Sequence, residues 1–102
     1  MKFFVISDNS DTYMGMRLAG MEGTVVHQYD ETVAALKTAM EDPDIAVVLM
    51  TQKLVSLCQD LVYQYKQQSK TTLIVEIPDR HGSSRLEENL ARYIKDAIGV
   101  KI

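Results

Sequence analysis

The chain has 102 residues, of which 46% are hydrophobic and 25% charged, and its 14 acidic and 11 basic side chains give a net charge of -3. This length predicts a single domain with one modest core. Because acidic side chains outnumber basic ones, the composition does not predict a basic surface that would attract nucleic acid or an anionic membrane. We therefore expect neither as a partner.

Few residues are available for covalent or metal chemistry. Cys58 is the only cysteine and cannot form an intramolecular disulfide, and with His27 and His81 it makes no grouping of the zinc type. The apolar run at residues 3–6 breaks at Ser7, far short of a signal peptide or a membrane span. We therefore expect a cytoplasmic protein that does not insert into the membrane and holds no metal or cofactor.

The first half of the chain alternates between strand and helix patterns. The continuous apolar run at 3–6 predicts a strand buried on both faces, and the polar cluster at 7–11 suits a turn and a helix cap. A short helix is expected from residue 11 to about 18, where Gly20 would stop it in a left-handed cap. The more polar segment 24–29 predicts a second strand near a sheet edge.

The alternation continues to the end of the chain. Asp30 suits the N-cap of a second helix, and the uncharged run at 45–50 predicts a central strand. Thr51 is expected to cap one amphipathic helix from 52 to about 68, and Pro78 ends a strand predicted at 72–77. A capping box of Ser84 and Glu87 then predicts a C-terminal helix over about 84–98.

Strands that alternate with helices predict a parallel sheet joined by right-handed crossovers. We therefore expect an α/β fold over residues 1–102: a single Rossmann-like or flavodoxin-like domain, with a four-stranded parallel sheet and helices on both faces.

Candidate catalytic groups each have a simpler structural interpretation. A phosphoacceptor receiver domain needs a carboxylate at the end of its third strand, where this chain has Met50 and Thr51, and Asp8 alone cannot supply that chemistry. Cys58 falls on the apolar stripe of a predicted helix, which favours a buried, inert thiol. Glu76 interrupts an apolar strand and is expected to face solvent or to be paired.

The segment from Met14 to Met21 does not fit a phosphate-binding loop. Its sequence is Met-Gly-Met-Arg-Leu-Ala-Gly-Met, and it matches neither the dinucleotide fingerprint nor the P-loop. Flexible methionines suit surfaces that adapt to partners, although a core helix also accounts for some of them. Both interpretations stay open at this point, with Leu18 a possible core residue. Because no group for catalysis or phosphate binding is left, contact with a protein partner is the leading functional class.

The whole chain resembles the F subunit of the V-type or archaeal-type rotary ATPase. The resemblance is carried by Ser7-Asp8, by residues 15–21, by residues 45–51 at the entry to the third helix, and by Glu76-Ile77-Pro78. It implies a non-catalytic central-stalk subunit that binds the coiled-coil D subunit inside the ring of catalytic A and B subunits. The pair would couple ATP hydrolysis or synthesis to ion transport.

Six residues are candidates for the partner interface: Met16, Arg17, Leu18, Met21, Arg85 and Arg92. Arg85 and Arg92 lie among acidic side chains on the predicted last helix, so surface ion pairing is the simpler interpretation for these two. A stand-alone receiver-like or small-ligand-binding regulatory domain is the alternative function.

Overall fold

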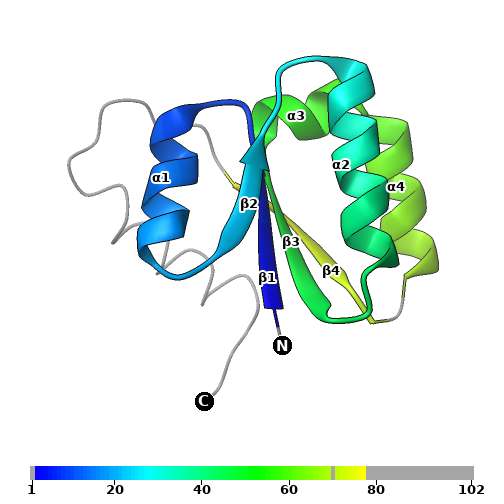
Figure 1. The fold of residues 1–102 in the computed structure, drawn as a ribbon. Coiled ribbons are helices and arrows are strands. Elements are labelled where there is room, and N and C mark those ends of the chain that lie inside the picture. Colours follow the sequence, from blue (N-terminus) through cyan, green and yellow to red (C-terminus); the bar gives the residue numbers. More distant parts are fainter. Residues whose placement is uncertain (1, 70, 78–102) are drawn as a thin grey trace.

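A four-stranded parallel sheet lies at the centre of the protein (Figure 1), and the computed structural model describes residues 2–69 and 71–77. The strands are β1 (Lys2–Ser7), β2 (Glu22–Val25), β3 (Ile45–Thr51) and β4 (Leu73–Ile77), in the spatial order β2-β1-β3-β4. The chain thus extends the sheet from β1 to one edge and then from β3 to the other, which is the doubly wound pattern. The predicted α/β class and parallel sheet are confirmed.

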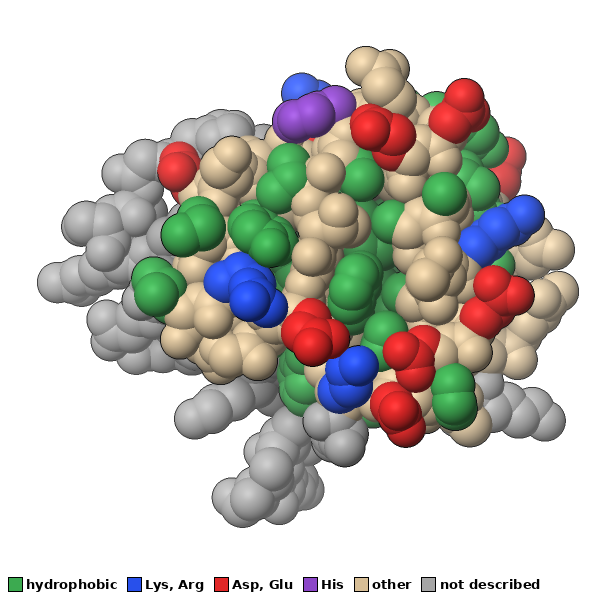
Figure 2. Space-filling model, viewed as in Figure 1, with side chains coloured by type: hydrophobic (Ala, Val, Ile, Leu, Met, Phe, Trp, Pro, Cys, Tyr) green, Lys and Arg blue, Asp and Glu red, His purple; other side chains and the backbone are tan. Residues whose placement is uncertain are grey.

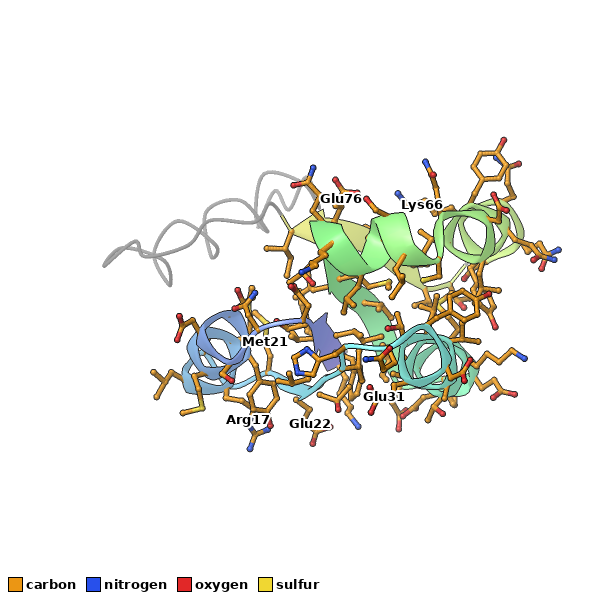
Figure 3. The ribbon with its side chains drawn as sticks, turned by 90° about the horizontal axis from the view of Figure 1, so that it is seen from above. Arg17, Met21, Glu22, Glu31, Lys66 and Glu76 are labelled. Atoms are coloured by element: carbon orange, nitrogen blue, oxygen red, sulfur yellow. The ribbon has the colours of Figure 1, made fainter. Side chains whose placement is uncertain are left out.

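Helices cover both faces of this sheet, as predicted. On one face α1 (Ser10–Leu18) packs against β1 and β2, and on the other lie α2 (Tyr29–Glu41), the short α3 (Gln52–Leu57) and α4 (Gln59–Gln68), as Figures 1 and 3 show. The C-terminal helix predicted at about 84–98 lies outside the described residues.

The two central strands bury side chains on both faces. In β1, Val5 points into the cluster beneath α1 and Ile6 into the cluster beneath α2 and α4, and both are fully buried. In β3, Leu49 likewise points into the cluster beneath α1, and Met50 points into the cluster beneath α2 and α4. A strand buried on both faces can carry an unbroken apolar run, which explains why residues 3–6 and 45–50 are so hydrophobic.

Helix α1 ends where the sequence predicts. Asn9 is its N-cap, and the Asn9 side-chain oxygen accepts a hydrogen bond from the backbone N–H of Thr12 at 2.8 Å. At the other end Gly20 has a φ of +89°, and the N–H of Met21 donates to the carbonyl of Met16. This is the Schellman arrangement, so the left-handed stop predicted for Gly20 is confirmed.

The boundaries of β2 and α2 differ from the prediction. β2 ends at Val25 rather than at residue 29, and α2 begins at Tyr29 with Gln28, not Asp30, as its N-cap. Gln28 and Glu31 form a capping box in which the Glu31 carboxylate accepts the backbone N–H of Gln28 at 3.2 Å. These reciprocal bonds satisfy the free amides of the first turn and therefore set the helix start.

The single helix predicted from 52 to 68 is divided. The backbone leaves helical geometry at Cys58, with φ -129° and ψ 46°, which separates α3 from α4. Neither proline nor glycine marks this position in the sequence. Leu54, Cys58 and Val62 are all buried in the same cluster on either side of the break, so both helices contribute to the core.

Candidate functional site

A doubly wound fold binds its ligands at the carboxyl edge of the sheet. Here the buried hydroxyl groups at that edge form hydrogen bonds with the chain's own backbone. Thr51 is buried at the end of β3, and its Oγ1 accepts the backbone N–H of Asp8 at 3.2 Å. Ser7 is buried at the end of β1, and its Oγ donates to the carbonyl of Asn9 at 2.7 Å. Thr51 therefore links two crossover loops and, contrary to the prediction, forms no side-chain cap for α3.

A small hollow lies at the same edge. It has a volume of about 160 Å³ and is lined by Asp8, His27, Lys53, Leu54 and Leu57. Ligand pockets for drug-sized molecules are about 300–1,000 Å³, so this hollow is too small for a nucleotide. No group of three or more His, Cys, Asp or Glu residues that could hold a metal occurs within 2–69 and 71–77.

Cys58 is buried, as predicted. The residue is 4% exposed, and its thiol donates to the carbonyl of Leu54 at 3.3 Å. Burial raises the pKa of the Cys58 thiol, because the apolar surroundings disfavour the thiolate. A protonated, inaccessible sulfur is a poor nucleophile, which supports the interpretation of an inert thiol.

Glu76 lies on β4, opposite Met50 of β3, and is half-buried. Among the described strands β4 is at one edge of the sheet, which gives the carboxylate a path to solvent. Figure 3 labels it near the outer margin of the molecule. This position agrees with the expectation that the side chain faces solvent.

The segment from Met14 to Met21 divides between core and surface. Met16 is 3% exposed and belongs to the core beneath α1, so its side chain does not reach the surface of this structure, and a partner contact at Met16 stays a prediction. Leu18, a possible core residue, is 73% exposed instead, and Met14 is 54% exposed. Met21 is half-buried, and Arg17 is exposed.

Arg17 is held close to the helix end. Its guanidinium donates from one NH group to the carbonyl of Met21 at 3.4 Å, which keeps the charge beside the α1–β2 turn (Figure 3). Basic side chains near a helix C-terminus also interact favourably with the helix dipole. Arg85 and Arg92, the other two basic candidates, lie outside the described residues.

Other large apolar side chains reach the surface where the sequence pattern did not predict them. Tyr29 at the start of α2, Leu57 at the end of α3, Tyr63 on α4 and Leu73 at the start of β4 are all at least 44% exposed. Leu57 lies three residues after the buried Leu54 on α3, yet it is 44% exposed, directly before the break at Cys58. Apolar periodicity alone could not have found it.

The topology defines a small doubly wound β/α protein of the flavodoxin type, with its carboxyl edge tied together by structural hydrogen bonds. The family model for the ATP synthase (F/14-kDa) subunit matches residues 3–94. The chain therefore belongs to the ATP synthase (F/14-kDa) subunit family.

Three relatives support this assignment over the full length. The F subunits of the A-type ATP synthases of Pyrococcus furiosus and Pyrococcus abyssi are 32% and 33% identical over 109 and 107 residues, with 100% of this chain and 98% of each relative covered. The F subunit of the A-type ATP synthase of Methanocaldococcus jannaschii is 31% identical over 103 residues, covering 100% of this chain and 99% of the relative. In the described residues no helix combines the length and apolarity needed to cross a membrane.

Proposed function

We propose that this chain is a non-catalytic central-stalk subunit of a V-type or A-type ATPase and that it binds the coiled-coil D subunit. Membership of the ATP synthase (F/14-kDa) subunit family supports this role. In the assembled enzyme the two subunits form the rotor inside the ring of A and B subunits and couple ATP hydrolysis or synthesis to ion transport. The chain then acts in the cytoplasm, at the membrane periphery.

The outer surface of α1 is the feature that best suits a protein partner. Met14 and Leu18 are one helical turn apart, so their exposed side chains lie on the same side of α1. Arg17 adds a positive charge next to Leu18, and Figure 2 shows basic and hydrophobic side chains side by side over α1. Exposed apolar side chains next to an arginine are typical of contact residues in protein interfaces. We define the α1 surface as Met14, Arg17, Leu18 and the adjoining Met21.

The direct experiment measures binding of the purified chain to its cognate D subunit by titration calorimetry. The Leu18→Glu variant places a charge on the α1 surface and is expected to weaken binding by about thirtyfold or more, the free-energy scale of an interface hot spot. Arg17→Glu is expected to act in the same direction.

Tyr63→Glu is the matched control, because Tyr63 is 64% exposed on α4, which covers the other face of the sheet. Its affinity should equal that of the wild type. The central-stalk role fails if the wild-type chain does not bind the D subunit. The assignment of the α1 surface as the binding surface is wrong if Tyr63→Glu weakens binding as much as Leu18→Glu.

The alternative function, a stand-alone receiver-like or small-ligand-binding domain, depends on the hollow beside Asp8, His27 and Lys53. This alternative is tested by titrating the chain with magnesium and acetyl phosphate, or with nucleotides. The measurement is the chemical shifts of the residues around the hollow. A saturable response would favour ligand binding, and unchanged spectra would remove this alternative.

A further inference from the structure

One side of α1 presents exposed residues at the spacing of a contact between two helices. Asp11, Met14 and Leu18 are separated by three and then four residues, and all three are exposed. Alternating intervals of three and four residues place side chains in line along a helix, and they are the a and d intervals of a coiled coil. We name these three residues the α1 seam.

The α1 seam is long enough for a partner helix that lies along it. Between Asp11 and Leu18 the helix rises about 10.5 Å, at about 1.5 Å per residue. Side chains at these intervals pack into the grooves of a second helix whose axis is inclined by about 20° to the first. A helix in that direction contacts all three residues at once, whereas a perpendicular helix would contact only one turn.

Arg17 lies beside the α1 seam and has unused hydrogen-bond donors. With Leu18 at position a, Arg17 takes the flanking position g, and its side chain lies at the outer margin of the molecule in Figure 3. A guanidinium has five N–H donors, and one of them reaches the Met21 carbonyl at 3.4 Å. Within residues 2–69 and 71–77 the ion pair is that of Lys2 with Glu22, and no carboxylate lies within 4.0 Å of Arg17. The remaining donors are available to a carboxylate of a partner.

The charges of α1 differ between its two ends. Asp11 lies in the first turn and Arg17 in the last, with Met14 and Leu18 along the same side. A matching helix carries a basic side chain near Asp11, apolar side chains in the middle and an acidic one beside Arg17. Complementary charges in an interface fix the register and exclude wrong partners. The charges of α1 therefore define where along its length the partner helix lies.

We propose that a helix of the D subunit lies along the α1 seam with an acidic side chain paired to Arg17. This inference rests on the proposed function, which supplies the partner, and it adds the chemistry of the contact. Flanking charges in coiled coils form salt bridges between helices that set partner choice and orientation. Arginine and carboxylate groups often pair through two parallel hydrogen bonds, which adds geometric specificity. Arg17 thus selects the register, and Met14 and Leu18 supply the apolar contact.

A charge exchange tests the pair. Arg17→Glu is combined with variants of the D subunit in which each acidic residue of its helices is changed to lysine in turn, and calorimetry measures each affinity. Arg17→Glu should bind wild-type D about tenfold more weakly or worse, because two like charges then face each other. One of the D variants should recover at least about fivefold of this loss and should weaken binding of the wild-type chain.

Lys66→Glu is the matched control for this exchange. Lys66 is exposed in the last turn of α4, as Arg17 is in the last turn of α1, so the change in charge and in helical position is the same. Because α4 covers the other face of the sheet, Lys66→Glu should bind D as tightly as the wild type.

Disulfide crosslinking measures the direction of the partner helix. Met14→Cys and Leu18→Cys are each oxidised with D variants that carry one cysteine along the helices, and the native Cys58 is buried. A disulfide needs Cβ atoms within about 4.5 Å. The two variants should therefore crosslink to positions about three or four residues apart on one helix of D.

The outcomes separate this inference from the proposed function. The inference is overturned if the wild-type chain binds D but no acidic residue of D compensates Arg17→Glu. It is also overturned if the two cysteine variants crosslink to different helices of D. If the wild-type chain does not bind D at all, the central-stalk role has failed instead.

Discussion

Met16 and Leu18 lie two positions apart on α1 and have opposite environments: Met16 is 3% exposed and Leu18 is 73% exposed. Met16→Ala should lower the free energy of unfolding by about 2–5 kcal/mol, because it leaves a cavity beneath the helix. Leu18→Ala should change it by no more than about 0.5 kcal/mol. Urea unfolding followed by circular dichroism measures both values. Equal losses for the two variants would contradict the placement of α1.

The two glycines flanking the start of β2 should respond differently to substitution. At Gly23 a Cβ atom would lie 2.8 Å from the Cβ of Val5 and closer still to the Val5 carbonyl, whereas at Gly20 no atom lies within 4 Å. Gly20→Ala should cost about 1–2 kcal/mol of stability, because of its left-handed φ alone. Gly20→Asn should cost less, since asparagine tolerates that region.

Any side chain at Gly23 must push β1 and β2 apart. Gly23→Ala and Gly23→Asn should therefore both destabilise the fold, by about 1–3 kcal/mol or more. Thermal unfolding of the four variants provides the comparison. If asparagine relieved the loss at Gly23 as it does at Gly20, backbone conformation and not the contact with Val5 would be the cause.

The bond from the Asp8 amide to Thr51 Oγ1 joins the ends of β1 and β3. Thr51→Val keeps the shape of the side chain but leaves the Asp8 N–H without its acceptor, which should cost about 1–3 kcal/mol. Thr51→Ser keeps the acceptor and loses one methyl group, which should cost about 0.8 kcal/mol. Amide exchange at Asp8 should accelerate in the valine variant only, and similar rates in both variants would argue against the bond.

Much of the fold could be predicted because its strongest signals are local. The apolar runs of β1 and β3 are long enough to identify central strands, and Gly20 identifies the end of α1 through its φ. The break at Cys58 could not be predicted in this way. It depends on how α3 and α4 pack on the sheet, and no residue at that position signals it.

The face of α1 could not be predicted either. Thr12, Gly15 and Met16 form the buried side, at spacings of three and four residues, although Met14 and Leu18 are the more hydrophobic pair with helical spacing. Small side chains at Thr12 and Gly15 let the helix approach the sheet closely. A count of hydrophobic residues selects the opposite face of α1, so the burial of Met16 could not be predicted from the sequence.

The start of α2 should depend on pH through Glu31. The backbone N–H groups of His27 and then Gln28 donate to its carboxylate and lower the pKa of Glu31 below its ordinary value of 4.5. A lowered pKa in the folded state means that the bonds stabilise the protein above the unfolded pKa, and that this stability is lost as the pH falls through the folded pKa.

Glu31→Gln keeps an acceptor oxygen but removes the charge. Its melting temperature should lie below that of the wild type at about pH 7, and the difference should shrink as the pH falls through the folded-state pKa of Glu31, where the wild-type carboxyl becomes protonated. Asp30→Asn is the control, because it removes a charge from the same helical turn without breaking the capping box. If the difference in melting temperature between Glu31→Gln and the wild type stayed constant as the pH fell, the carboxylate charge would not stabilise the start of α2.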